Sequence, residues 1–352
     1  MPSVTVSIVS SNVRPEVGEA VANGLEARGL QARFLEDATP EAMRSDLILL
    51  LGGPSSQRTT IGRIERARSG RPGVAAWLFE PLPPPELPCD TVRRATRFSA
   101  IRTGRRWTRP LMRFLSWPTD AMLARRAGRG LSASNMRFFI DSASFAFRGT
   151  ERGWLDAVFV STEQKRAQLA DWGVPSTFLP VGQQPAFGRD LGLDRDIDLL
   201  FIGSMKSRRR QAALKSLFAT ARGQGLTVHV PEGAVWGEDR TRLINRARVL
   251  LHVHQFDWDT PWMRWCLAAA NGAVVISEPL SLPDPLRPGV DYVEAPLSGM
   301  AALLAELARN EDRRLAMLAA SRARIEATMT QGASLDRLAE RLLALARERR
   351  DR

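Results

Sequence analysis

Short apolar runs alternate with longer amphipathic stretches along almost the whole chain. In the first half, apolar runs at 3–10, 30–36, 46–53, 73–80, 154–162 and 176–182 have the length of buried strands. An amphipathic stretch at 15–28, which ends near Gly29, predicts a helix between the first two strands. This alternation is typical of parallel sheets covered by helices, so we predict an α/β fold.

The same alternation restarts after a polar, Pro- and Gly-containing stretch at 183–196. Strands are expected at 197–204, 226–230, 248–254 and 273–278, and helices at 207–223, 237–247, 260–271, 297–309, 311–328 and 333–350. We therefore predict two Rossmann-like domains, 1–182 and 197–330, joined by a linker at 183–196. A C-terminal helix within 331–352 could pack back on the first domain.

Length and composition fit this division. A chain of 352 residues suits two domains, and 44% hydrophobic with 25% charged residues is a globular composition. No apolar run approaches the roughly 20 residues that span a bilayer, and the start MPSVTVSIVSSNV lacks the basic region of a secretory signal. The two cysteines, Cys89 and Cys266, are far apart, which indicates a reducing compartment and a cytoplasmic protein.

Charge is distributed unevenly. The formal net charge is +12, and the stretch 93–148 holds thirteen arginines against two acids, Asp120 and Asp141, an excess of 11. We expect this stretch to be helical in pieces, broken at Pro110, at Pro118 and at the glycines 128 and 130. Arginines mixed with aromatic residues suit an anionic membrane surface, so the protein could be peripheral at the inner face of a membrane. A solvated basic surface or a groove for an acidic acceptor is the alternative.

The sequence IGSMKSRRR at 202–210 is the first candidate site. A buried strand ends at Gly203 and Ser204, and a basic cluster then opens a helix. Glycine allows the main chain to approach an anion, while the helix N-terminus and Lys206, Arg208 and Arg209 supply positive charge for a diphosphate. The spacing matches neither a P-loop nor GxGxxG. The alternative is a turn followed by a solvated basic helix face.

The second candidate site is the segment 251–279, a strand, a polar and aromatic loop, a short helix and another strand. His252 and His254 are two residues apart on a strand and so share a face. With three histidines in the chain and no further ligand cluster, a metal site is not expected. We predict a hydrogen-bonding role for one of them, with core packing as the alternative.

Two acids and one base in that loop could take part in chemistry. Asp257 and Asp259 precede the short helix, and Asp259 could instead cap it. Arg264 lies one turn into the helix and could reach a phosphate or one of these carboxylates. Gly272 and Glu278, which follow the helix, complete the predicted donor-binding set.

Residues 155–345 resemble group 1 glycosyltransferases, which have the GT-B fold, and above all their spore-maturation-type branch. The resemblance rests on FVSTEQKRAQLADWGVPSTFLPVG, DLLFIGSMKSRRR, MRWCLAAANGAVVISEPLSLPDPLRPGVDYV and NEDRRLAMLAASRARIEATMT. It implies a donor site for a nucleotide-diphosphate sugar in the C-terminal half, facing a cleft between the two domains. The family carries two glutamates eight positions apart, the first near the sugar and the second on the ribose. Here Asp259 stands at the first position and Leu267 at the second.

This resemblance implies a hexosyltransferase-like enzyme without a metal or other cofactor, in which basic side chains stabilise the leaving diphosphate. Glu80 and Asp141 are the candidate bases of the acceptor domain, which contains no histidine, and this absence favours a retaining transfer. The acceptor could be a lipid-linked precursor of a cell-envelope glycan. Because Leu267 cannot bind a ribose hydroxyl, an inactive sugar-nucleotide-binding scaffold is one alternative, and a basic nucleic-acid-binding protein is another.

Overall fold

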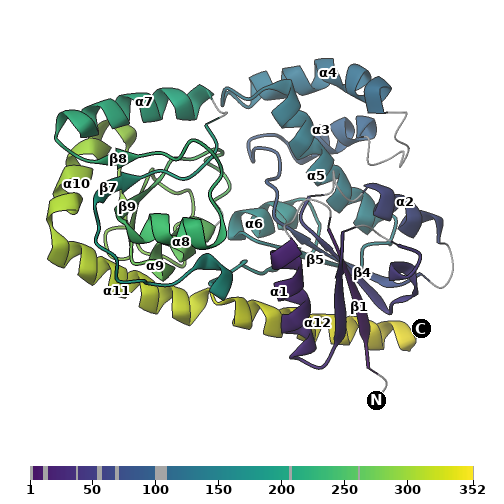
Figure 1. Ribbon diagram of the computed structural model, residues 1–352. Helices are drawn as coiled ribbons and strands as arrows, with labels where there is room; N and C mark the ends of the chain where they lie inside the picture. The colour runs from purple at the N-terminus through teal and green to yellow at the C-terminus, as the bar shows by residue number, and fades with distance from the viewer. Residues whose placement is uncertain are drawn as a thin grey trace. The chain divides into compact units, whose positions relative to one another are not determined.

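The chain folds into two compact units, an N-terminal unit of Met1–Leu179 with Leu335–Arg352 and a C-terminal unit of Pro180–Ser334 (Figure 1). The structure is a computed structural model that describes residues 3–10, 15–36, 39–53, 58–67, 71–99, 109–205, 208–260 and 262–351. Within these residues, no helix combines the length and the apolar character needed to cross a bilayer.

The N-terminal unit is built on a six-stranded parallel sheet with the order β2-β1-β3-β4-β5-β6. Its strands are β1 (Thr5–Val9), β2 (Gln31–Leu35), β3 (Leu47–Leu51), β4 (Gly73–Leu78), β5 (Ala157–Val160) and β6 (Thr177–Phe178). Every residue of β3 and β4 is buried. Such continuous apolar strands are expected where helices cover both faces of a parallel sheet.

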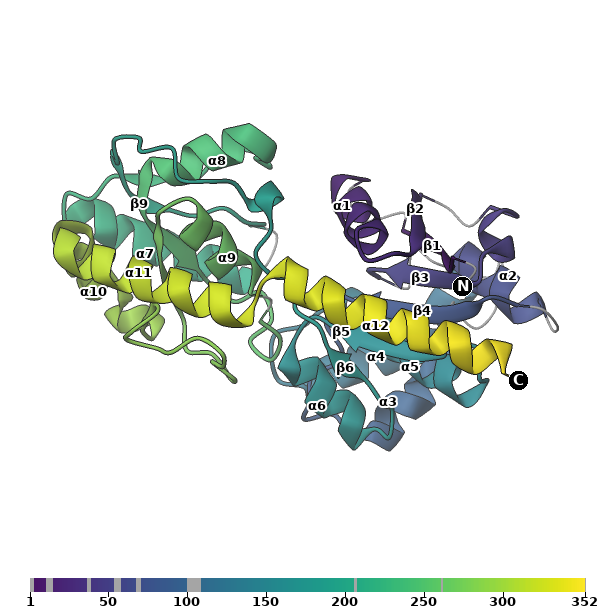
Figure 2. The same cartoon turned by 90° about the horizontal axis from the view of Figure 1, so that it is seen from below.

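Helices from both ends of the chain cover one face of this sheet. The helices of the unit are α1 (Pro15–Glu26), α2 (Arg58–Arg66), α3 (Cys89–Ala95), α4 (Arg109–Arg126), α5 (Ala133–Glu151), α6 (Glu163–Asp171) and α12 (Gln331–Arg350). Leu25 of α1 and Leu338 and Leu342 of α12 share a core cluster with Ile8 and Leu49 of the sheet. The last helix of the chain therefore completes the core of the first unit (Figure 2).

The arginine-rich stretch is less broken than we predicted. Helix α4 runs through Pro118, so the expected break there is wrong. A proline inside a helix removes one hydrogen bond and costs about 3 kcal/mol, which packing of the helix can offset. Pro110 lies in the first turn, where its missing N–H has no partner in a helix anyway. Gly128 and Gly130, both with positive φ, do separate α4 from α5.

The C-terminal unit has a five-stranded parallel sheet with the order β11-β10-β9-β7-β8. Its strands are β7 (Ile197–Leu200), β8 (Val228–His229), β9 (Ala247–His252), β10 (Val274–Ser277) and β11 (Val293–Glu294). Its helices are α7 (Arg208–Gly223), α8 (Gly237–Asn245), α9 (Met263–Ala270), α10 (Leu297–Arg309) and α11 (Glu311–Thr328). One core cluster joins α7 and α10 to the sheet, and a second joins α8, α9 and the end of α11 to it. Helices thus cover both faces of this sheet as well.

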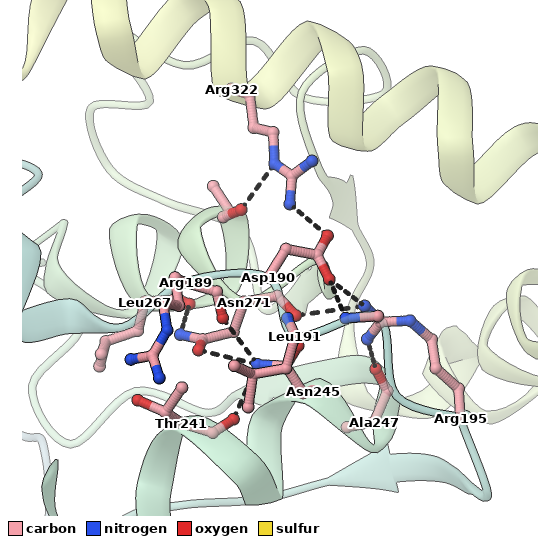
Figure 3. Close-up of polar contacts among 12 residues, drawn as sticks. Arg189, Asp190, Leu191, Arg195, Thr241, Asn245, Ala247, Leu267, Asn271 and Arg322 are labelled. Carbon is pink, nitrogen blue, oxygen red and sulfur yellow. Dashed lines mark hydrogen bonds and ion pairs between the residues drawn. The ribbon is translucent and has the colours of Figure 1, made fainter. Parts of the chain in front are cut away.

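The polar stretch before β7 is fixed on the C-terminal unit by two fully buried asparagines (Figure 3). Asn245 donates from Nδ2 to the carbonyl oxygen of Arg189 (2.9 Å) and accepts at Oδ1 from the Leu191 amide (2.6 Å). Asn271 donates to the carbonyl oxygen of Phe187 (2.8 Å) and, one turn back in α9, to that of Leu267 (2.7 Å). Because these amides satisfy main-chain groups of Phe187, Arg189 and Leu191, which lie outside the strands, they determine the path of the segment.

Two glycines in this segment provide a matched test. Gly188 has φ +105°, and a Cβ there would lie 2.5 Å from Asn271 Oδ1 and 2.6 Å from Thr241 Oγ1, whereas Gly192 has φ +63° and open space around it. Gly192→Ala is expected to lower the free energy of unfolding by about 1 kcal/mol, through left-handed backbone strain alone. Gly188→Ala adds a steric clash and is expected to cost about 3 kcal/mol. Urea denaturation of both variants measures the difference, and equal losses would contradict this account.

Candidate functional site

Polar and aromatic side chains gather where β7, β9 and β10 end at the carboxyl edge of the C-terminal sheet. Phe201 and Gly203 follow β7, His252 closes β9, and Glu278 follows β10 directly. Helix α7 begins at the same edge, because Arg209 in its first turn donates to the carbonyl oxygen of His254 (3.1 Å). In open α/β sheets ligands bind at this edge, where helix N-termini carry a partial positive charge.

Arg264 of α9 lies half-buried between the ends of two strands. Its Nη1 donates to the carbonyl oxygens of Ile202 (2.5 Å) and Leu251 (3.2 Å), and its guanidinium lies 5.6 Å from the centre of the Phe201 ring. Among the described residues no carboxylate pairs with it, and its Nε, which is buried, has no hydrogen-bond partner. Burial, and secondarily the charge of Arg210, lowers the pKa of Arg264 to about 9. Arg264 is still almost fully charged at neutral pH, so this edge holds a half-buried positive charge that an anion could neutralise.

A second buried arginine, Arg210, was not among the predicted site residues. It donates to the carbonyl oxygens of Val253 (2.7 Å) and Ser204 (3.0 Å), and burial, then the charge of Arg209, lowers its pKa. The helical spacing could have revealed it. Positions 210, 214, 217 and 221 share one face of α7, and the last three carry the buried Leu214, Leu217 and Ala221.

Arg209 and Glu278 form an ion pair that joins α7 to the sheet. Arg209 donates from Nη1 to Glu278 Oε2 (3.1 Å) and from Nη2 to Glu278 Oε1. Glu278 Oε2 also accepts from the main-chain amide of His254 (2.8 Å). The hydrogen bond to Glu278 raises the pKa of Arg209. The carboxylate thus holds both the first turn of α7 and the chain just beyond β9 in place.

The two histidines of β9 and its extension form a directional hydrogen-bonded pair. His254 Nε2 lies 2.9 Å from the carbonyl oxygen of Pro279, and since a carbonyl only accepts, this nitrogen carries a hydrogen. In a neutral His254, Nδ1 then accepts from His252 Nε2 at 3.4 Å. Burial lowers the pKa of His252 well below 6.5, and Arg264 lowers it further. In this tautomer His252 Nδ1, which is buried and has no hydrogen-bond partner in the described part of the chain, is an acceptor.

Four other predicted residues of this region, Gly203, Ser204, Asp257 and Asp259, differ in exposure. Asp257 is exposed and Asp259 is buried, both between β9 and α9. The predicted start of the helix at 260 is wrong, because α9 begins at Met263 and its N-cap is Trp262, so Asp259 does not cap it. A Cβ at Gly203 would lie 3.3 Å from Arg264 Nη2 and 3.1 Å from the Phe201 ring, so a side chain here would crowd both residues. Ser204 is exposed.

Two basic residues of the 202–210 motif add little to the geometry. Arg208 is the first residue of α7, and Lys206 lies outside the described residues. Leu267 of α9 is half-buried against the core cluster of α8, α9 and α11. In the described part of the chain, no group of three or more His, Cys, Asp or Glu side chains could hold a metal ion.

Of three further predicted residues, one lies at the opposite edge of this sheet and two belong to the N-terminal unit. Gly272 precedes β10, at the opposite, amino edge of the sheet, where its φ of +76° ends α9. Asp141 is buried in α5 of the N-terminal unit, where it accepts from Ser99 Oγ (2.6 Å) and pairs with Arg137 (3.8 Å). Glu80 follows β4 in the same unit, and a Cβ at Gly53 would lie 2.3 Å from its Oε1.

Comparison with known proteins agrees with this architecture. Residues 208–340 match the profile of the family described as "Glycosyl transferase-like". Anabaena HepE, solved with UDP and glucose, is 10% identical with a TM-score of 0.61 over 97% of this chain and 100% of that chain. Sucrose-phosphate synthase from Thermosynechococcus elongatus is 12% identical with a TM-score of 0.60 over 97% and 99%. TarM from S. aureus is 11% identical with a TM-score of 0.54 over 87% and 57%. No curated protein matches the sequence.

These similarities define the class of fold. The chain has the GT-B fold of glycosyltransferases, with two units on parallel sheets of six and five strands, as we predicted from the sequence. The family profile matches residues 208–340, which include most of the C-terminal unit.

The half-buried charge of Arg264 leads to a prediction about stability. Because its pKa is lower in the folded than in the unfolded protein, the charged form destabilises the fold at every pH below about 9, and this penalty is relieved as the pH rises from 9 towards 12.5. Arg264→Met removes the penalty at neutral pH but also loses two hydrogen bonds, so we expect the free energy of unfolding to rise by about 1 kcal/mol. Chemical denaturation at pH 7 measures it. A large loss of stability would show that Arg264 is a structural residue.

Proposed function

We propose that this protein is a glycosyltransferase that takes a sugar from a nucleoside diphosphate donor, with UDP as the nucleotide. The observation that carries the proposal is the half-buried guanidinium of Arg264, which donates to main-chain carbonyls at the carboxyl edge of the C-terminal sheet and pairs with no carboxylate among the described residues. The choice of UDP is supported by the similar structures, since HepE was solved with UDP and with UDP-glucose.

In this proposal the diphosphate lies against Gly203 and the first turn of α7, near Arg264. The absence of a side chain at Gly203 lets main-chain amides approach the phosphate oxygens, as at other helix N-termini that bind anions. Arg264 stabilises the charge that develops on the leaving diphosphate. It is assisted by Arg208 and Arg209 of α7 and by the neighbouring Ser204 and Lys206. This assignment gives the protein residues the role that a metal ion has in other transferases.

The sugar and the ribose lie nearer the 251–279 segment in this proposal. His252 Nδ1 accepts a hydrogen from a donor hydroxyl, and His254 fixes the tautomer that makes this possible. Asp259 stands at the position of the family glutamate near the sugar, with Asp257 beside it. Glu278 contributes by orienting Arg209, since both its oxygens already accept hydrogen bonds. We propose a retaining, hexosyl transfer of the spore-maturation type.

The acceptor side belongs to the N-terminal unit in this proposal, and a lipid-linked acceptor in the cytoplasm fits its basic and aromatic residues. Glu80, after β4, and Asp141, which is held by Ser99 and Arg137, are the candidate bases. One observation favours a second function, a scaffold that binds sugar nucleotides without turnover. The half-buried Leu267 offers no oxygen where the family has a ribose-binding glutamate.

Thermal-shift measurements with UDP and a panel of UDP-sugars test the proposed site. A nucleotide at 100 times its dissociation constant is expected to add about 2.7 kcal/mol of apparent stability to the wild-type protein. The stable Arg264→Met variant is expected to lose this shift, and Gly192→Ala serves as a folded control that keeps it. Binding with no release of UDP from any donor would support the scaffold, and the absence of any nucleotide shift would contradict both functions.

Nucleotide affinity is expected to depend on pH through Arg264. A bound diphosphate favours the charged guanidinium, so the affinity should be constant below pH 9 and fall by up to tenfold per pH unit above about 9, where the free protein loses this charge. Arg209→Gln should weaken UDP binding at every pH without changing that slope, because Glu278 raises the pKa of Arg209. Isothermal titration calorimetry between pH 7 and pH 10 measures both. A flat profile for the wild-type protein would contradict the role of Arg264.

A further inference from the structure

Helix α4 exposes the apolar side of its surface to solvent. Five large apolar side chains of this helix are exposed. They are Phe114 (78%), Trp117 (58%), Leu111 (54%), Met122 (54%) and Leu115. Positions 111, 114, 115, 118 and 122 follow the three- and four-residue spacing of a single helix face. A surface helix of an ordinary globular protein presents polar residues on this side.

The opposite side of α4, which faces the protein, carries a charged residue of the kind that normally faces water. Asp120 is buried there and accepts from Arg137 Nε of α5 at 2.8 Å, while Ser116, Leu123 and Ala124 are buried beside it. The ion pair and the apolar contacts hold α4 on α5, so the apolar outer face is not required for packing within the N-terminal unit. An exposed apolar patch of this size on a rigid helix indicates a binding surface.

Positive charge accompanies the apolar face. Arg125 and Arg126, in the last turn of α4, are exposed on the same side, and Asp120 is the one acid in the sequence of the helix. On the neighbouring segment, α3 and the turn after it, Arg94 and Arg97 are exposed as well. Apolar and aromatic side chains flanked by arginines match a bilayer surface with anionic lipids, which offers hydrocarbon below a layer of negative headgroups.

We propose that α4 is a membrane-docking helix, which lies in the plane of an anionic bilayer surface with Leu111, Phe114, Leu115 and Met122 in the acyl region and Arg125 and Arg126 among the headgroups. Trp117, at the edge of this face, takes the interfacial position that tryptophan favours. The inference does not depend on the proposed nucleotide site, because it uses residues of the N-terminal unit alone.

Vesicle binding tests the proposal. The full-length protein is expected to co-sediment with vesicles of phosphatidylcholine and phosphatidylglycerol, more weakly at high salt, and to bind pure phosphatidylcholine far less. Phe114→Ser should lower the partition coefficient about tenfold, by loss of buried apolar area. Arg125→Gln and Arg126→Gln should each lower it about fivefold on anionic vesicles, where one basic residue contributes on the order of 1 kcal/mol. Brominated lipids should quench tryptophan fluorescence less in Trp117→Phe than in the wild type.

Matched controls come from other exposed positions. Leu315→Ser removes a leucine that is 56% exposed on α11, and Arg337→Gln removes an exposed arginine of α12, so both should leave binding unchanged. The thermal midpoint of Phe114→Ser, and any shift of it by UDP, should equal the wild-type values, which separates lost docking from misfolding and from failure of the nucleotide site.

Three results would overturn the proposal. They are no vesicle binding by the wild-type protein, equal binding to neutral and anionic vesicles, and unchanged binding by Phe114→Ser. Light scattering after size exclusion tests the competing occupant, a second copy of the chain. A wild-type dimer that Phe114→Ser converts to a monomer would assign this face to self-association instead.

Discussion

The half-buried guanidinium of Arg264 is the interaction on which the candidate site depends. The carbonyl groups of Ile202 and Leu251 lie at the ends of neighbouring strands, and Arg264 satisfies both from a single nitrogen. The same group joins α9 to the ends of β7 and β9 and leaves a positive charge at the carboxyl edge. These contacts hold the charge at the edge where we propose that the diphosphate binds.

Arg209 and Arg264 lie near the same sheet edge but differ in whether a carboxylate neutralises their charge. Arg209 is half exposed and paired with Glu278, so its charge is largely neutralised by the ion pair that holds α7 to the sheet. Arg264 faces carbonyl dipoles, an aromatic ring and no acid among the described residues, and its field remains available. These two neighbouring arginines thus differ in how strongly their charge is neutralised, which a count of basic residues does not reveal.

Hydrophobic periodicity predicted the class of the fold and most elements, since continuous runs such as LILLL have few alternatives to a buried parallel strand. It placed Gly203, Arg209, His252, His254, Arg264 and Glu278 at one sheet edge, because parallel strands end together. It could not show that Arg264 would choose carbonyls over Asp257 or Asp259, since this depends on tertiary distances. Pro118 was misjudged because local propensity was given more weight than the packing of α4 on α5.

The position of α12 has a consequence for how the chain acquires its structure during synthesis. Leu335, Leu338 and Leu342 cover the same sheet face as Val6 and Ile8, so the hydrophobic core of the first unit combines residues that precede the second unit in the chain with residues that follow it. Until α12 has been synthesised, the first sheet has one apolar surface only partly covered. The second unit, contained within 180–334, is synthesised before α12 and needs none of its core residues from elsewhere. The N-terminal unit therefore completes its core after the second unit has been made, and its apolar sheet face stays open to aggregation in the interval.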